Sequence, residues 1–373
     1  MRRQRLRPLA AFVLTSCTFA SRQNDPPASA TSLTGAVGES SGGASDDDDD
    51  GEGDDSGAAS GGLKLDVAAD TDSTPCAEGG CDDACAVPPH QACDGDSDDL
   101  LQAIGLDCPG ELAIEGTVEA AAVAQGVRSG FGSTSTWAPR EGTRMAVLGT
   151  GVVADLDLET PSGDQAIAPT HCNDDVGPQW DKGPSLPAPL QPKDVAGDCA
   201  SAPALVGSGD CSNSIQKQYE QGVSANDYAE LRLSAQVPAG STSFSYDLAF
   251  FSVEYPFYYF SEFNDMYVGW LESESWTGNI SFDAFDNPIS LNASFLDYRD
   301  DDGSAPELAG TCMRGHAGTK WLTTTAPVVP GEQVTIVFAI FDLSDSILDS
   351  FVFLDNFQWG CEGGDHPTTE PVG

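Results

Sequence analysis

The chain has 373 residues, enough for one large or two modest domains, and its formal net charge is −43 at pH 7. A surface this acidic repels the phosphates of nucleic acids, which argues against a nucleic-acid partner. It is compatible with bound cations, with cationic partners or with solubility alone, and a content of 40% hydrophobic residues is enough for a folded core.

The first residues have the layout of a secretion signal. Four arginines precede a short apolar run from Leu9 to Leu14, which is too short to span a bilayer. The run ends in Leu14-Thr15-Ser16-Cys17, which resembles a bacterial lipobox. The resemblance implies that residues 1–16 are a lipoprotein signal peptide and that Cys17 carries a lipid; ordinary cleavage nearby is the alternative. Thr18 is not the Asp that resembles an inner-membrane retention signal, which favours the outer membrane or cell surface.

Residues 17–75 are expected to be a disordered spacer. Gly, Ser, Ala, Thr and Asp dominate this stretch, which includes SDDDDDGEGDDSG at residues 45–57. A segment with few apolar side chains and a high like charge cannot offset the entropy lost on ordering. The predicted arrangement is therefore a folded module tethered to a membrane by a flexible acidic stalk.

The cysteines predict an oxidising compartment. Without Cys17 the chain has ten, an even number as disulfide pairing requires, and disulfides persist outside a reducing cytosol. We expect all ten to form disulfides, although the sequence leaves their pairing open; Cys312 could pair with Cys361, and Cys172 with Cys199 or Cys211. The ten are Cys76, Cys81, Cys85, Cys93, Cys108, Cys172, Cys199, Cys211, Cys312 and Cys361.

Residues 76–110 form a small Cys-rich segment. Its cysteine spacing is not that of a zinc site. The stretch DGDSDD at residues 94–99 begins like a calcium loop but lacks the Gly and Glu of that motif at the sixth and twelfth positions. The alternative is a short helix over residues 97–106, with Ser97 or Asp98 as its N-cap.

Residues 111–363 predict an all-β fold, an antiparallel β-sandwich of jelly-roll-like type, followed by a tail at 364–373. Short apolar or alternating runs are separated by Gly, Pro, Asn or Asp, with hardly any helical periodicity. A Pro- and Cys-bearing insertion interrupts the pattern at about residues 170–215. The expected strands from residue 228 onward lie in the ranges 228–237, 241–255, 265–273, 279–285, 319–328, 332–342 and 349–359.

Two of these strands predict a metal site at their ends. Counting by twos along each strand, the apolar row that begins at Phe244 reaches Glu254, and the row that begins at Val334 reaches Asp342. An unpaired buried carboxylate is costly, and a shared cation would relieve both. Oxygen ligands suit Ca²⁺. The alternative places both acids past the strand ends, in water. The full expected ligand set is Glu254, Asn264, Asp265, Asp342, Asp345 and Asp349.

The same region is the most aromatic of the chain, with ten aromatic residues between 250 and 270. Pro256 predicts that the stretch after it is a loop or an edge rather than a regular central strand. Exposed aromatic side chains there could stack on sugar rings or on another protein; packing in the core is the alternative. The candidate ligand-binding residues are Tyr255, Phe257, Tyr258, Tyr259 and Trp276.

Three sequence blocks resemble the choice-of-anchor L domain family of bacterial surface proteins. They are MAVLGTGVVADLD at 145–157, FSYDLAFFSVEYPFYYFSEFNDMYVGWLES at 244–273 and VPGEQVTIVFAIFDLSDSILDSFVFLDNF at 329–357, in the order that the family has them. The resemblance covers residues 117–361 and implies an extracellular β-sandwich of undefined activity. The chain departs from the family at Ser252-Val253-Glu254, where the family has Ser-Glu-Glu.

These observations predict a non-catalytic surface module. The chain has no HExxH and no GxSxG motif. We expect a lipid-anchored cell-surface protein with a binding or adhesion role, stabilised by calcium, whose ligand is a glycan or a surface protein. The alternatives are a secreted carbohydrate-active enzyme that uses Glu254 and Asp342 as a glycosidase-type pair, and a purely structural envelope protein.

Overall fold

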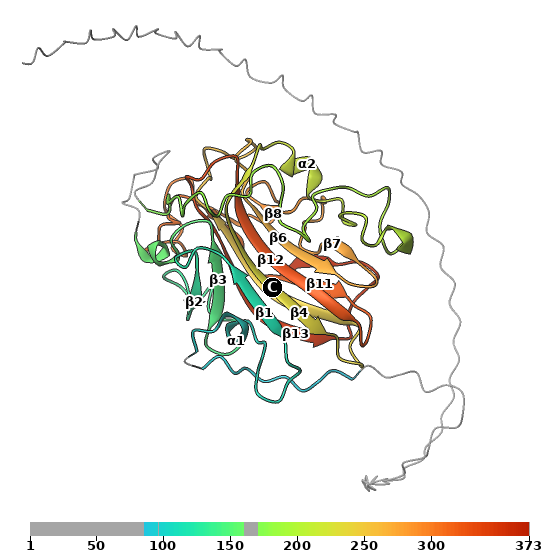
Figure 1. Ribbon diagram of the computed structural model, residues 1–373. Helices are drawn as coiled ribbons and strands as arrows, with labels where there is room; N and C mark the ends of the chain where they lie inside the picture. Colours follow the sequence, from blue (N-terminus) through green and yellow to red (C-terminus); the bar gives the residue numbers. More distant parts are fainter. Residues whose placement is uncertain (1–85, 96, 160–170, 373) are drawn as a thin grey trace, which may run out of the picture. The chain divides into compact units, whose positions relative to one another are not determined.

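Two antiparallel β-sheets packed face to face form the body of the molecule (Figure 1). The computed structural model describes residues 86–95, 97–159 and 171–372. The expected signal peptide, Cys17, the spacer, Cys76, Cys81 and Cys85 lie outside the described residues. Within the described ranges no helix is long and apolar enough to cross a membrane.

The first sheet has the strand order β1-β4-β12-β6-β7, and β8 pairs with β6. Apart from β6 and β7, neighbours along this order are far apart in the sequence, so the chain crosses repeatedly between the two sheets. The strands are β1 (Glu115–Glu119), β4 (Ala225–Gln236), β12 (Gln333–Leu343), β6 (Met266–Glu272), β7 (Thr277–Asn279) and β8 (Ile289–Ser290).

The second sheet has the order β14-β11-β5-β13-β3-β2, with β10 beside β5 and β9 beside β10. The predicted all-β antiparallel sandwich is thus confirmed. Its strands are β14 (Thr368–Pro371), β11 (Leu322–Pro327), β5 (Ser243–Ser252), β13 (Ser350–Gly360), β3 (Met145–Gly149), β2 (Gln125–Arg128), β10 (Ala317–Gly318) and β9 (Tyr298–Arg299). The short helices are α1 (Leu100–Ala103), η1 (Val153–Asp157), η2 (Pro203–Leu205) and α2 (Gln216–Tyr219).

The core between the sheets is built from alternate residues of the long strands, because successive side chains of a strand point to opposite faces. Leu231 of β4, Phe338 of β12 and Leu248 of β5 belong to this core. The outer faces are covered too: Phe251 and Phe353 pack on the outside of the second sheet, and the first sheet is covered by residues of the 171–222 insertion. Burial on both faces explains why these strands are nearly continuous apolar runs.

Before β1, the Cys-rich segment packs against the sandwich without forming the expected helix in full. The predicted helix at 97–106 reduces to α1, and its N-cap is Asp99, whose carboxylate accepts the N–H of Leu101 (2.8 Å). Ser97 and Asp98 do not cap it. Asp94 accepts the backbone N–H groups of Thr143 and Arg144, each at 2.5 Å, so this aspartate pins a turn of the sandwich.

The disulfides differ from the predicted pairings. Cys93 bonds to Cys108, Cys172 to Cys312, and Cys199 to Cys211. Cys361 is also disulfide-bonded. The expected bonds from Cys312 to Cys361, and from Cys172 to Cys199 or Cys211, are wrong, because Cys172 and Cys312 meet across 140 residues while Cys199 and Cys211 pair with each other within one loop.

Candidate metal centre

The apolar rows between the sheets change to polar residues at one end of the sandwich. The starts of β4, β6 and β13 and the ends of β3, β5 and β12 all lie there, as their strand registers show. Counting by twos along each row places Asp342 after Ile340, Asp265 before Tyr267, and Ser350 before Val352. The core is therefore closed at this end by a layer of polar side chains.

Five carboxylates are almost fully buried in and beside this layer, and a sixth is half-buried. We call them the acidic cluster. Repulsion between their charges links Asp342 with Asp265 and Asp349, and links Glu254 with Asp265 and Asp345. The buried members, each at most 1% exposed, are Asp227, Glu254, Asp265, Asp342 and Asp349; Asp345 is the half-buried member.

Hydrogen bonds satisfy only part of the cluster. Asp265 accepts the N–H of Leu343 (3.2 Å) and the hydroxyl of Ser350 (2.6 Å), and Asp349 Oδ1 accepts the N–H of Asp174 (2.9 Å). Other oxygen atoms have no hydrogen-bond partner among the described residues, and no Lys, Arg or His there forms an ion pair with the cluster. These unpartnered atoms are both carboxylate oxygens of Asp227 and of Asp342, Glu254 Oε2, Asp345 Oδ1 and Asp349 Oδ2.

Burial raises the pKa of every member. It raises the pKa of Glu254 to about 10, with the charges of Asp265 and Asp345 adding to the shift. It raises the pKa of Asp265 to about 7, where the charge of Asp345 adds to the shift and hydrogen bonds, chiefly that of Ser350, oppose it. The pKa of Asp227 is about 7 for the same reasons, and the pKa values of Asp342 and Asp349 lie well above the ordinary value. Without a cation, the fold therefore favours protonated carboxyl groups here, since charged ones are neither solvated nor paired.

The donor set suits a hard cation. All the unpartnered atoms are carboxylate oxygens, the ligands that Ca²⁺ prefers, and Ca²⁺ accepts about 6–8 of them in flexible geometry. Among the described residues, no three Asp, Glu, His or Cys side chains are already arranged around one point as metal ligands. A bound ion would have to displace the protons of these carboxyl groups and draw the resulting carboxylates together around itself.

A close backbone approach surrounds Asp349. A Cβ atom built at Gly151, in the chain after β3, would collide with the carboxylate of Asp349. The backbone of Asp349 is held by two bonds, its N–H to the carbonyl of Cys172 and its carbonyl to the N–H of Val253, both 3.1 Å. The carboxylate therefore occupies a cradle that only glycine leaves open.

Most residues of the expected ligand set lie in the acidic cluster, and that they bind a metal stays a prediction. Glu254 and Asp342 are buried, as the alternation predicted, so the alternative that placed them in water is wrong. Asn264 is buried but its amide is used elsewhere: it donates to Gln218 (2.5 Å) and accepts the N–H of Asn292 (3.0 Å). Asp227 was missed, although counting back along β4 from Leu231 and Ala229 reaches it.

The candidate ligand-binding aromatics divide into two groups. Trp276 and Tyr255 are 1% and 7% exposed and pack in the core between the sheets, so they are wrong as surface contacts. Tyr258 and Tyr259 are half-buried, and Phe257 is 47% exposed. Phe260, which is 71% exposed, was not among the candidates. Its backbone φ of 61° is unusual for a residue with a Cβ.

Residues 255–263, which we call the aromatic loop, are flanked in the sequence by two members of the acidic cluster. Glu254 precedes the loop and Asp265 follows it by two residues. As Pro256 predicted, the chain leaves β5 at Ser252 and forms turns rather than strand until β6. Inside the loop, the N–H of Phe260 donates to Asn292 (2.8 Å). A cation in the cluster would thus fix both ends of the loop.

Two further loops join the aromatic loop through Ser344, which has a φ of 86°. Its hydroxyl donates to the carbonyl of Glu262 (3.0 Å) and accepts the N–H of Val223 (3.3 Å). These loops also carry exposed aliphatic residues. Together they form what we call the apolar rim: Val223 (69% exposed), Phe257, Phe260 and Ile347 (51% exposed).

Comparison with known proteins leaves the family open. No protein-family model matches the chain, and no curated protein matches its sequence. The resemblance to the choice-of-anchor L domain therefore stays a prediction, and the proposed function rests on the site itself.

Proposed function

We propose that this chain is a non-catalytic binding module of the cell envelope, tethered by a lipid on Cys17, in which a calcium ion in the acidic cluster holds the aromatic loop in its binding conformation. The observation that carries the proposal is the position of Glu254 and Asp265. Each is at most 1% exposed, and they flank the loop that carries the exposed Phe257 and Phe260. Metal binding and presentation of the loop are thereby coupled.

The partner proposed for the apolar rim is a protein with an apolar patch bordered by basic residues. Phe and aliphatic side chains, rather than the buried Tyr255 and Trp276, are what the rim exposes, which favours a protein surface over a sugar ring. Glu262 lies exposed in the aromatic loop, and the net charge of −43 favours a cationic border on the partner.

A binding role fits the acids better than glycoside hydrolysis does. A glycosidase must admit a sugar between its two carboxyl groups. Glu254 and Asp342 are each about 1% exposed, beneath the turns that follow β5 and β12. A polysaccharide has no path to them in this arrangement, whereas a small cation needs only a local opening of the loops.

Calorimetric titration of the oxidised full chain with Ca²⁺ tests the metal site. We expect binding to the native protein that Asp342→Asn and Glu254→Gln abolish or weaken at least tenfold. Glu262→Gln is the matched control, because Glu262 is an exposed acid of the same loop. Absence of Ca²⁺ binding, or equal binding by all three variants, would contradict the proposal.

A photo-crosslinking amino acid tests the binding face on intact cells. Placed at position 260, it should capture a protein partner in Ca²⁺ and lose it in chelator. Position 285 is the control, since Phe285 is 75% exposed but lies outside the aromatic loop. Equal capture from both positions, or capture that ignores Ca²⁺, would argue against a calcium-held face at the aromatic loop.

A further inference from the structure

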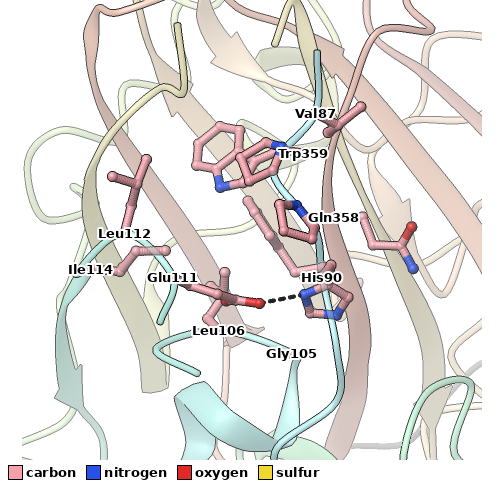
Figure 2. Close-up of a pocket in the computed structure, with 12 residues that line it drawn as sticks. Val87, His90, Gly105, Leu106, Glu111, Leu112, Ile114, Gln358 and Trp359 are labelled. Atoms are coloured by element: carbon pink, nitrogen blue, oxygen red, sulfur yellow. Dashed lines mark hydrogen bonds and ion pairs between the residues drawn. The ribbon is translucent and has the colours of Figure 1, made fainter. Parts of the chain in front are cut away.

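A cavity of about 190 Å³ lies at the opposite end of β13 from the acidic cluster (Figure 2). The Cys-rich segment and the residues that lead from it to β1 form one wall, and the last residues of β13 form the other. The cluster touches the first residue of β13, Ser350, whereas the cavity is lined by Phe357, Gln358 and Trp359 near its end. The two sites are therefore separate, and a role for this cavity is independent of the proposed function.

Most of the cavity lining is apolar. Trp359 is half-buried and packs edge-on against Phe357 (ring centroids 5.4 Å apart) and Phe244 (6.1 Å), which holds the indole in place. Leu106 and Ile114 are buried beside it. An apolar lining of this kind accepts a ring or a short aliphatic chain and releases its hydration water. The remaining apolar lining residues are Val87, Pro88, Pro89 and Leu112.

Besides the exposed Gln358, one polar group interrupts this lining. His90 Nδ1 lies 2.9 Å from Glu111 Oε1, and His90 Nε2 lies 2.6 Å from Glu141 Oε1 (Figure 2 draws the Glu111 contact). Glu141 Oε2 has no hydrogen-bond partner among the described residues. Two carboxylates therefore share one imidazole, so the group keeps a net negative charge even when His90 is protonated.

Gly105 makes this arrangement possible. Its φ is +87°, and a Cβ built there would lie 2.7 Å from Glu141 Oε2 and 3.4 Å from His90 Cε1. The backbone must pass this close for His90 to reach both acids. The polar group is thus positioned by the fold and is not a chance contact of surface side chains.

We propose that the cavity binds a small organic cation, an ammonium group on an aromatic or short aliphatic body. The body would lie against Trp359, and the ammonium would contact the carboxylate of Glu111. Charge-assisted hydrogen bonds to a carboxylate are strong, and an indole face also attracts cations. An anionic ligand would meet the carboxylate of Glu111 in the lining, with Glu141 on the other side of the His90 ring, within a chain of net charge −43. A free amine and the lysine side chain of a partner both carry this chemistry.

Calorimetric titration of the oxidised full chain with phenethylammonium tests the proposal. Two controls have the same ring: 3-phenylpropionate carries a negative charge, and 2-phenylethanol carries none. We expect phenethylammonium to bind at least tenfold more tightly than either control. Equal or tighter binding of 3-phenylpropionate would overturn the proposal. A parallel titration with Nα-acetyl-lysine methylamide separates the sources: stronger binding than phenethylammonium indicates a lysine of a partner, and weaker binding indicates a free amine.

Two variants locate the contact. Glu111→Gln should lower the affinity for phenethylammonium about tenfold or more while leaving that for 2-phenylethanol unchanged, since only the charge is removed. Glu115→Gln is the matched control, because Glu115 is an exposed acid four residues away on β1. If Glu111→Gln fails to fold, nuclear Overhauser contacts between the probe and the Trp359 indole in the unaltered protein decide the question. Their absence, or equal affinities of the two variants, would contradict the assignment.

Discussion

Asp265, just before β6 in the first sheet, accepts a hydrogen bond from the hydroxyl of Ser350 at the start of β13 in the second sheet (2.6 Å). The bond is buried and joins the two sheets at the acidic end. Asp265 thus has a structural role besides any role in metal binding, so its removal would disturb the fold in either case. The carboxyl group of Asp342 accepts no well-formed hydrogen bond among the described residues and has Thr150 and Asp265 as polar neighbours, which makes it the cleaner residue for testing a cation.

Asp342→Asn should be more stable than the parent protein in chelator and less stable than the parent in calcium. In chelator the variant should be more stable than the parent protein, with a free energy of unfolding about 1 kcal/mol or more higher, because a buried unpaired acid is removed. With Ca²⁺ at 100 times its dissociation constant, the parent should gain about 2.7 kcal/mol and the variant little. Denaturant unfolding with EDTA and with Ca²⁺ measures both. A variant that is less stable under both conditions would point to a purely structural Asp342.

The disulfide between Cys172 and Cys312 should support the metal site as well as the fold. It joins residues 140 apart, and closure of so long a loop stabilises by about 4–5 kcal/mol. The carbonyl of Cys172 also accepts the N–H of Asp349 (3.1 Å), so the Cys172→Ser/Cys312→Ser pair should lower both the free energy of unfolding and the Ca²⁺ affinity. Denaturant unfolding and calorimetric titration of the double variant measure the two effects.

The bond between Cys199 and Cys211 is the control for that experiment, because it joins residues only 12 apart and neither cysteine backbone is hydrogen-bonded to the acidic cluster within the described ranges. Its removal should cost about 3 kcal/mol of unfolding free energy and leave Ca²⁺ affinity unchanged once the protein is folded. An equal loss of Ca²⁺ affinity in both double variants would show that the effect is general destabilisation.

Gly151→Ala should damage the cradle around Asp349. The added methyl would collide with the carboxylate, so the chain or the side chain must shift, at a cost of about 1–3 kcal/mol in unfolding free energy. Ca²⁺ affinity should fall with it. Gly126→Ala is the control, since a Cβ there meets only Val153 and Val147 at ordinary distances (3.8 and 3.9 Å). Thermal unfolding and calorimetry of the two variants measure the difference, and a Gly151→Ala protein with unchanged Ca²⁺ affinity would exclude Asp349 as a ligand.

Phe260→Gly should separate binding from stability. The phenyl ring is 71% exposed and its backbone φ of 61° is strained for a residue with a Cβ, so glycine should leave the free energy of unfolding unchanged or raise it by up to about 1 kcal/mol. Capture of a partner by the apolar rim should nevertheless be lost. Phe285→Gly, at an exposed residue outside the aromatic loop, should keep the capture. A clear drop in the melting temperature of Phe260→Gly would show instead that the ring is packed.

His90 should make the packing of the Cys-rich segment depend on pH. The hydrogen bond to Glu141 is the main cause that raises the pKa of His90 above its ordinary value of 6.5, with Glu111 adding to it and burial opposing it. A histidine whose pKa is higher in the folded state stabilises the fold fully below about pH 6.5, its ordinary pKa. This contribution is lost as the pH rises through the pKa of the folded state. The stability difference between the parent and His90→Gln should therefore shrink from pH 6 to pH 8. A difference that is constant with pH would contradict a protonated His90.

The burial of the acids could be predicted because strand alternation is a local property. The rows from Phe244 to Glu254 and from Val334 to Asp342 are readable in the sequence, and so is the break at Pro256. The same count would have reached Asp227. What that count could not show is the distortion of the strand at Asp227, where φ is 46° and the register between β4 and β12 shifts, because a local distortion leaves no periodic signal.

The amino-acid sequence by itself therefore determined the all-β class, the buried ends of two strands and the aromatic loop, since each depends on the order of neighbouring residues. Only the tertiary structure decided which cysteines pair, that Trp276 is in the core, and that His90 meets Glu141 across 51 positions of sequence. These contacts depend on how the loops between distant strands come together. Their closeness is set by the packing of the two sheets, to which no short stretch of sequence corresponds.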